Sequence, residues 1–411
     1  METKVTDIEE VGKGPVSLGG LIAASIRRNA RQSTMFISLI VIWILFAILT
    51  ERVFLTPRNL SNLLVQTVTT AILAVGMVLV IVAGHIDLSV GSVLGFTGAV
   101  CALVLIKLEW SVLPAVLVTL LAGTLVGAWH GFWIAYRRVP SFIVSLASML
   151  AFRGLIIGIT GGQTQGLELA PEAAAERFKL IGQGYLPTLA AAGEGQVHDT
   201  SLYLLLGLVA VFVAMAVRRR RARQRYGFPV LPASAEALRL LLVSAIIAAL
   251  GMILVLYLGI PWAVIFVLVL AVVLSFVAEH TTFGRHLYAI GGNQDAARLS
   301  GISVPRHTFG LFVLMGTLAA MAGVFYTARL NAATTSAGQN AELDAIAAAV
   351  IGGSSLAGGE GTIFGAIVGA LVMTSLDNGM SLMNLDITFQ YVIKGMILLL
   401  AVWVDIVQRR K

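Results

Sequence analysis

Long apolar runs follow one another along most of this chain, and they constrain its fold more than any other feature. A helix needs about 20 apolar residues to cross roughly 30 Å of hydrocarbon. The runs predict about 12 spans, of which the tenth and eleventh are short and rich in glycine and could be half-helices or a re-entrant pair. The predicted spans are 33–50, 63–84, 88–106, 113–136, 142–160, 202–217, 238–258, 261–278, 308–328, 344–356, 363–376 and 388–407. The pattern predicts an all-α, polytopic membrane protein.

The composition agrees with this class. Of 411 residues, 58% are hydrophobic and 12% are charged, whereas a soluble domain carries about 25% charged residues. The single cysteine, Cys101, lies in an apolar run, so no disulfide forms within the chain and a small buried hydrophobe is expected there. The chain starts with polar residues, and no small-residue cleavage site follows the first apolar run. We therefore expect no cleaved signal peptide.

Basic residues set the predicted orientation. The net charge is +7, but Lys and Arg lie in short loops between apolar runs. This pattern orients a membrane protein and does not indicate binding to nucleic acid. With the N-terminus inside, the inside segments hold about 20 basic residues and the outside segments about 6. Both termini are therefore expected in the cytoplasm.

The predicted spans divide the chain into a cytoplasmic N-terminal tail, 1–32, and a transmembrane domain, 33–408. Three connections are long: 161–200 on the periplasmic side, a basic cytoplasmic loop, 218–237, and a second cytoplasmic loop, 279–307. The basic loop begins with "RRRRARQR". This run is typical of a topology anchor, or alternatively of a patch that binds anionic lipid or a partner.

Catalytic and metal-binding motifs are missing from the sequence. It contains no G-x-x-x-x-G-K-[ST] phosphate loop, so the chain is not expected to bind ATP in that manner. Its six histidines show no close metal-ligand spacing such as H-E-x-x-H. We therefore expect no catalytic site, no metal site and no cofactor in this chain.

Asp87 and Ser89 lie in "AGHIDLSVGS", at the junction of the second and third spans. Aspartate and serine just before an apolar run suit a helix N-cap, which accepts hydrogen bonds from free backbone N–H groups. The alternative is a contribution to a translocation path. The candidate path residues are Asp87, Ser89, Arg153 and Asn378.

Two basic side chains fall within predicted spans. Arg153 is deep in the fifth span, where a charge normally faces protein or a water-filled cavity. Lys394, in the last span, invites the same interpretation, although it could also reach the membrane surface. For both Arg153 and Lys394, a role in a functional path and a role in a structural ion pair are equally possible. Asp377 and Asp386 are possible partners of Lys394.

Two glycine-rich segments suggest specific roles. In the inside segment 281–304, "QDAARLSGI" predicts one short helix with apolar Ala297 and Ile302. This helix suits docking into a cleft on a cytosolic partner, or it is a surface helix with no partner. In the segment 345–372, small residues at close spacing predict tightly packed helices. Unwound backbone that faces a substrate is the second interpretation there.

Five motifs in order carry a family resemblance: "AVGMVLVIVAGHIDLSVGS", "VPSFIVSLASMLAFRGLIIGIT", "FGRHLYAIGGNQDAARLSGISV", "AELDAIAAAVIGGSSLAGGEGTIFGA" and "SLDNGMS". They resemble the ribose/xylose permease family of bacterial ABC sugar importers, over nearly the whole chain from Leu60 onward. Extra apolar spans beside the arginine-rich loop, and "LLAVWVD" near the C-terminus, are similar to the xylose-type branch.

The resemblance implies a permease subunit of an importer in the bacterial inner membrane. Its core would be the ten-span arrangement of vitamin B12-type importers, with spans six and seven added. The implied partners are a cytoplasmic ATPase subunit that uses ATP and Mg, a periplasmic sugar-binding protein, a second permease copy and membrane lipid. Xylose is the implied substrate; ribose, galactose, arabinose, inositol and other small polyols are alternatives.

The resemblance also implies a coupling segment that fits a groove on the ATPase. Its residues are Gly284, Arg285, Gly291, Gly292, Asn293, Ala296, Arg298 and Gly301. One departure is His85, where such permeases commonly have Gly or Glu before Ile-Asp. A histidine can change charge near neutral pH, so it could have a role there, or it could be a tolerated substitution.

Two other classes remain as alternatives. A proton- or sodium-coupled secondary transporter would carry several acidic groups within its spans. A membrane-embedded enzyme that acts on lipid would carry a nucleophile or metal ligands at membrane depth. Neither alternative explains the glycine-punctuated inside segment.

Overall fold

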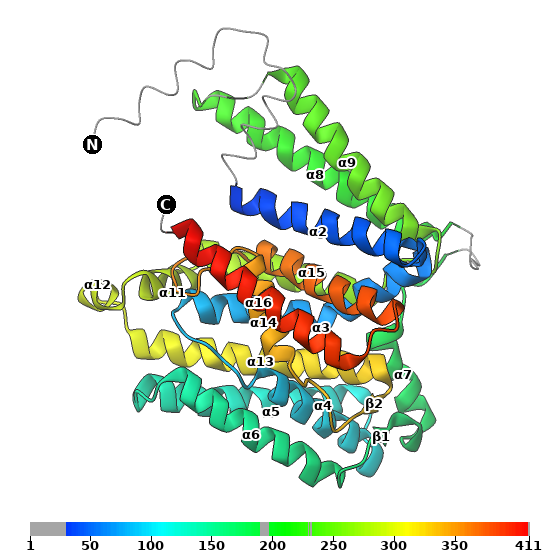
Figure 1. Cartoon of the computed structure of the whole chain (residues 1–411), viewed down its shortest axis with the longest axis vertical. Coiled ribbons are helices and arrows are strands. Elements are labelled where there is room, and N and C mark those ends of the chain that lie inside the picture. The colour runs from blue at the N-terminus through cyan, green and yellow to red at the C-terminus, as the bar shows by residue number, and fades with distance from the viewer. Residues whose placement is uncertain (1–29, 190–196, 229, 231, 410–411) are drawn as a thin grey trace.

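The computed structural model describes residues 30–189, 197–228, 230 and 232–409, and it confirms an all-α architecture. The helices form one elongated bundle in which most of them run roughly parallel or antiparallel (Figure 1). They are α2 (Ala30–Leu49), α3 (Pro57–Val82), α4 (Val90–Lys107), α5 (Val112–Gly131), α6 (Ser141–Thr160), α7 (Glu172–Gln183), α8 (Asp199–Arg225), α9 (Ala233–Val255), α10 (Trp262–His280), α11 (Thr282–Gly292), α12 (Gln294–Leu299), α13 (Val304–Leu330), α14 (Ala341–Ile351), α15 (Ile363–Leu382) and α16 (Ile387–Arg409). A two-stranded antiparallel pair, β1 (Gln165–Gly166) and β2 (Ala332–Ala333), closes one end.

Nine helices in the described part of the chain are long and apolar enough to cross a membrane. The apolar parts of α2 and α16, Met35–Leu49 and Ile387–Trp403, are shorter. The predicted count of about 12 full spans is therefore not confirmed. The predicted tenth span corresponds to α14, whose 11 residues cover only about 16 Å. The predicted eleventh span corresponds to α15, which has 20 residues and is not short.

The two ends of the bundle carry different connections. α11 and α12 lie at one end, together with the first turn of α2 and the last turn of α16 (Figure 1). We call this the α12 end. α7, β1 and β2 lie at the opposite end, called here the α7 end (Figure 1). The connections predicted on the cytoplasmic side and those predicted on the periplasmic side therefore lie at opposite ends of the bundle. Which end faces the cytoplasm stays a prediction, and residues 1–29 and 410–411 lie outside the described residues.

The core of the bundle is built around α3 and α13. The most apolar stretch of α3 is 83% buried and that of α13 is 67% buried, and α13 packs against α3, α4 and α5. The predicted close packing in 345–372 is also present, because Gly369 of α15 lies directly against the backbone of Ala348 in α14. Cys101 is fully buried, as expected.

α8 and α9 form an antiparallel hairpin on the outside of the bundle (Figure 1). Only 11% of the most apolar stretch of each is buried, so most of their surface is free to face lipid. The arginine-rich run is not a loop: it continues α8 to Arg225, and Arg220 Nη1 lies 3.9 Å from Glu236 Oε2 of α9. The connection between the two helices is therefore shorter than the predicted 218–237 loop. Parts of the predicted loops, at 190–196, 229 and 231, lie outside the described residues.

Candidate functional site

Two helices begin inside the bundle, and their first turns meet. The irregular segment 83–89 leads from the α12 end into α4. The segment 334–340, called here the re-entrant segment, leads from the α7 end into α14. Gly91, in the first turn of α4, lies directly against the carbonyl oxygen of Gly338 and the Glu342 carboxylate, where a Cβ atom would overlap both. Chain breaks that enter from opposite ends are typical of membrane transport proteins.

Asp87 and Ser89 hold the start of α4. Both side chains are almost fully buried. The Ser89 backbone N–H and hydroxyl donate to Asp87 Oδ1 at 2.9 and 2.6 Å. Ser89 is the N-cap residue, but its hydroxyl makes no capping bond to α4 itself. The contacts support the packing interpretation and show no side-chain cap on α4, and a role in a path stays a prediction.

Arg153 of α6 forms hydrogen bonds to the backbone of the re-entrant segment. It lies about 10 Å, roughly two helical turns, before the end of α6. Its Nη1 donates to the carbonyl oxygen of Ala337 at 2.8 Å, with the Thr335 carbonyl oxygen at 3.5 Å. The guanidinium therefore faces protein, as expected for a charge within a span. Its partners are backbone atoms, which no sequence pattern identifies.

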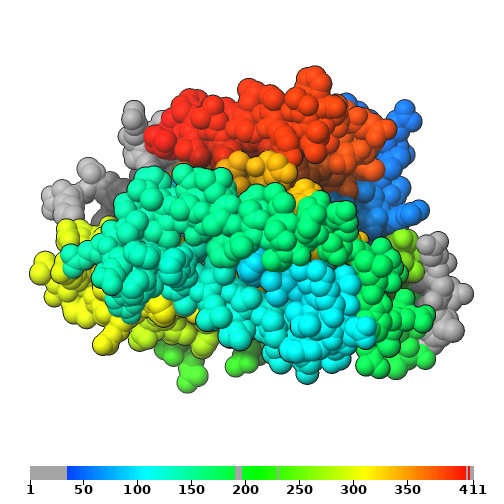
Figure 2. Space-filling model, turned by 90° about the horizontal axis from the view of Figure 1, so that it is seen from below, coloured from blue at the N-terminus to red at the C-terminus, as the bar shows by residue number. Residues whose placement is uncertain are grey.

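The re-entrant segment reaches the surface in a recess between α6 and α16. Figure 2 shows amber residues, the colour of residues near 340, between the blue-green surface of α6 and the red and orange C-terminal helices. Ser336 and Gln339 are exposed, and Thr335 and Asn340 are half-buried. Non-helical backbone at membrane depth is tolerated only where protein covers it or where it lines a water-filled cavity. This face therefore cannot lie against lipid.

Lys394 joins three helices through two carboxylates. Its Nζ donates to Asp344 Oδ2 of α14 at 3.0 Å and lies 2.8 Å from Asp377 Oδ1 of α15. The suggested partner Asp377 is confirmed. Asp386 is not a partner, because it accepts from the Thr388 backbone N–H at 2.8 Å at the start of α16. The sequence did not reveal Asp344, because its place on the half-helix depends on where α14 begins.

Asn378 pairs with Asn59. The Asn59 amide donates to Asn378 Oδ1 at 2.8 Å, and the Asn378 amide donates to Asn59 Oδ1 at 3.1 Å. Both residues are buried between α3 and α15. The structure therefore places this candidate path residue in a buried helix-to-helix contact, and a role in a path stays a prediction.

A short helix, α12, is present in the inside segment as predicted, but it ends at Leu299, so Ile302 lies beyond it. Asn293 caps it, accepting from the Ala296 backbone N–H at 2.9 Å. Ala297 is buried, whereas Gly292, Ala296 and Arg298 are exposed, and Gly301 turns the chain with φ +83°. Leu299, at the end of α12, is 90% exposed. An apolar side chain this exposed at the tip of a projecting helix suits docking to a partner.

α11 is anchored to the bundle on several sides. Gly291 lies directly against the carbonyl oxygen of Val82, at the end of α3. The Tyr288 hydroxyl donates to the Gly361 carbonyl oxygen at 2.8 Å, just before α15. His286 Nδ1 lies 2.9 Å from His307 Nε2 of α13. α11 therefore connects α12 to the ends of α3, α13 and α15. The roles of Tyr288 and the histidine pair were not apparent in the sequence.

Two of the predicted coupling residues sit at the start of α11. The Gly284 backbone N–H donates to the hydroxyl of the N-cap residue Thr281 at 3.2 Å, and Gly284 itself is buried. Arg285 Nη1 donates to the His280 carbonyl oxygen at 3.2 Å. Both residues therefore fix the junction of α10 and α11.

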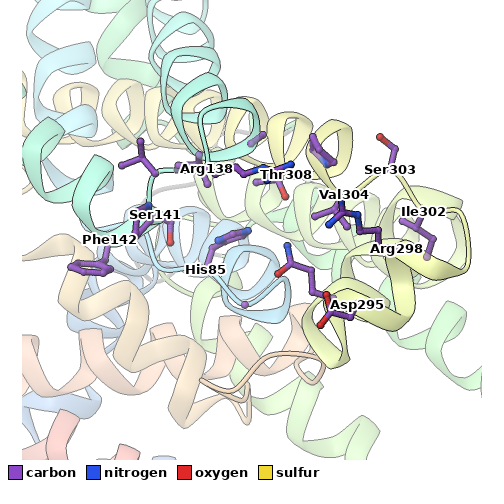
Figure 3. A pocket seen from close by; sticks show the side chains of 17 residues that line it. His85, Arg138, Ser141, Phe142, Asp295, Arg298, Ile302, Ser303, Val304 and Thr308 are labelled. Carbon is purple, nitrogen blue, oxygen red and sulfur yellow. The ribbon is translucent and has the colours of Figure 1, made fainter.

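An open pocket of about 650 Å³ lies at the α12 end, between α12 and the connection from α5 to α6. Figure 3 shows His85, Arg138 and Arg298 around it, on three different segments. Asp295 and Ser141 also line it. Burial lowers the pKa of His85 below its usual 6.5, so this side chain is neutral at pH 7. Among the described residues, no group of three His, Cys, Asp or Glu could hold a metal ion.

Three features together define a polytopic transport permease. They are a bundle of apolar membrane-spanning helices, a segment that re-enters this bundle, and the projecting helix α12 next to the anchored α11. The family described as "Branched-chain amino acid transport system / permease component" matches residues 59–402, and the chain belongs to it. This result and the relatives below confirm the predicted resemblance to a transport permease, which is not an enzyme.

The relatives are sugar permeases by name. The chain is 48% identical over 385 residues to the Xylose transport system permease protein XylH of Escherichia coli (strain K12), with 93% of each chain covered. It is 44% identical to the protein of that name from Haemophilus influenzae, with 93% of this chain and 98% of the relative covered. It is 34% identical over 370 residues to the Ribose import permease protein RbsC of Escherichia coli (strain K12), with 90% of this chain and 92% of the relative covered. No solved structure matches the chain.

Proposed function

We propose that this chain is the membrane-spanning permease subunit of an ABC importer that carries D-xylose across the bacterial inner membrane. The main support is the 48% identity to a xylose permease over 93% of the chain, against 34% to a ribose permease. Ribose, galactose, inositol and other small polyols are the alternative substrates. Both termini lie in the cytoplasm in this proposal, so the α12 end faces the cytoplasm.

A separate ATPase subunit docks on the coupling segment and supplies the energy. It binds ATP and Mg, and this chain binds no cofactor of its own. The support is the exposed tip of α12 and the contacts of the adjoining α11 with the ends of α3, α13 and α15. Closure of the ATPase subunits pushes α12, and this movement opens the path to one side of the membrane at a time. A periplasmic sugar-binding protein delivers the sugar at the α7 end.

A second copy of this chain covers the recess between α6 and α16. The recess exposes Ser336, Gln339 and irregular backbone at membrane depth, which lipid cannot satisfy. The flanking helices expose apolar side chains such as Leu150 and Leu399, which a second copy would bury. The path then runs between the two copies, along the re-entrant segment of each.

Substrate uptake by the assembled importer tests this proposal. The permease would be reconstituted in vesicles with its ATPase and with binding proteins loaded with labelled xylose or labelled ribose. We expect ATP-dependent import of xylose that exceeds import of ribose. A preference for ribose would contradict the substrate, and the absence of any sugar import would contradict the function.

A further inference from the structure

We propose that the re-entrant segment and Arg153 contact the sugar as it passes, so that the permease itself contributes to sugar selectivity. This inference rests on the proposed function. It goes beyond that function because it assigns selectivity to residues of the permease as well as to the binding protein. The ligand is a neutral polyol, which is recognised through its hydroxyl groups.

The position of the segment is the first argument. Arg153 holds Ala337 about 10 Å inside the end of α6. The segment lies on the floor of the recess between α6 and α16 (Figure 2). At that depth its exposed groups face either water or a passing solute once a second copy covers the recess.

Unused hydrogen-bonding groups are the second argument. The side chains of Thr335, Ser336 and Gln339 make no hydrogen bond to any other described residue, and all three are exposed or half-buried. Arg153 uses Nη1 for the segment, and a guanidinium has further N–H donors. An amide and two hydroxyls supply both donors and acceptors, which match the hydroxyl groups of a sugar.

Charge is the third argument. The side chains of 334–340 are all uncharged. Arg153 places a positive charge at the segment, and the nearby Glu342 carboxylate is buried against Gly91 and does not reach the recess. Such a set binds a neutral polyol through individually weak hydrogen bonds. Weak binding suits a path, because a tightly bound sugar would not leave.

The test combines transport with chemical labelling. Gln339→Leu removes hydrogen bonding at similar side-chain size, and Gln163→Leu is the matched control, because Gln163 is an exposed glutamine beyond the end of α6. We expect Gln339→Leu to slow xylose import from saturated binding protein by about five-fold and to change the xylose-to-ribose ratio. The control should match the wild type in both.

Labelling gives a readout that does not depend on transport rate. Replacing Cys101 with Ala removes the only native thiol, and Ser336→Cys then places a single thiol on the segment. We expect a water-soluble maleimide to label it in the assembled importer and xylose to slow that labelling. Unchanged selectivity in Gln339→Leu, or a thiol that is unreactive or insensitive to sugar, would overturn this inference alone. A wild-type importer that carries no sugar would overturn the proposed function instead.

Discussion

Gly291 is the residue at which the coupling segment touches the core most closely. A Cβ atom there would overlap the Val82 carbonyl oxygen, which is backbone and cannot rotate away. The neighbouring Gly292 has open space around it and an ordinary φ. Two adjacent glycines therefore offer a matched comparison at one place in the chain.

We expect Gly291→Ala to displace α11 from the end of α3. Overpacking of this kind costs about 1–3 kcal/mol. Sugar import should fall strongly while the protein still inserts in the membrane, and Gly292→Ala should keep wild-type import. Initial uptake rates with equal amounts of membrane-inserted protein provide the measurement. Equal rates in the two variants would contradict a tight contact between α11 and α3.

His85 provides a pH prediction. Burial lowers the pKa of His85 below its usual 6.5, so the folded protein disfavours the protonated form. His85 therefore lowers the stability of the fold only as the pH falls below about 6.5. We expect His85→Gln to preserve the import rate from about pH 6.5 to about pH 8. Initial uptake rates across this range test it. A pH dependence that is present in the wild type and lost in the variant would show that His85 titrates during transport.

Sequence reasoning at this scale identified polar residues but not all of their partners. The costs of burying Arg153 and Lys394 indicated that each must be satisfied. Of the two carboxylates suggested as partners of Lys394, Asp377 is one and Asp386 is not. The Ala337 carbonyl oxygen was not identified, because a backbone acceptor becomes available only where the chain leaves a helix.

At the scale of elements, α14 is a half-helix that two kinds of contact hold in place. Glu342 lies against Gly91 on α4, and Asp344 bonds Lys394 on α16. The hydropathy pattern overestimated this element because the small apolar residues around Gly352 belong to a turn after α14. The polar residues 334–340, in turn, lie within the bundle although their composition is typical of a loop.

We expect Lys394→Met to destabilise the packing of α14, α15 and α16. The substitution leaves Asp344 and Asp377 as neighbouring carboxylates without their cation. The side chains of this ion pair are half-buried, so the loss falls between that of an exposed and that of a buried pair, on the order of 2 kcal/mol. The midpoint of thermal unfolding in detergent should fall clearly.

The matched control neutralises the carboxylates as well. Lys394→Met with Asp344→Asn and Asp377→Asn leaves no unpaired charge, and most of the lost stability should return. If the triple variant unfolds as early as the single one, the ion pairs are not what stabilises this contact.

At the scale of the whole molecule, the recess predicts how two copies meet. Leu150 lies one helical turn before Arg153, on the same face of α6, and is 66% exposed. Val211 on α8 is 56% exposed on the outer hairpin. With Cys101 replaced by Ala, a bifunctional maleimide should link two copies through Leu150→Cys and not through Val211→Cys. Gel mobility distinguishes these outcomes, and linkage only through α8 would place the interface elsewhere.

Much of the overall architecture could be predicted from hydropathy, because a bilayer requires long apolar helices. The helical class, nine of the spans and the short helix α12 follow from composition and turn residues. The half-helix, the re-entrant segment and the anchoring of α11 do not. They depend on contacts such as Gly91 against Gly338, which join segments far apart in the chain.

The most direct test of the account is the energy source of transport. Several carboxylates lie within the bundle, as they would in a proton-coupled transporter: Asp87, Glu342, Asp344 and Asp377. Vesicles would contain the permease and its ATPase, with ATP inside and xylose-loaded binding protein outside. We predict xylose uptake that requires ATP hydrolysis and persists when the proton gradient is abolished. Uptake that continues without ATP and follows an imposed proton gradient would contradict the account.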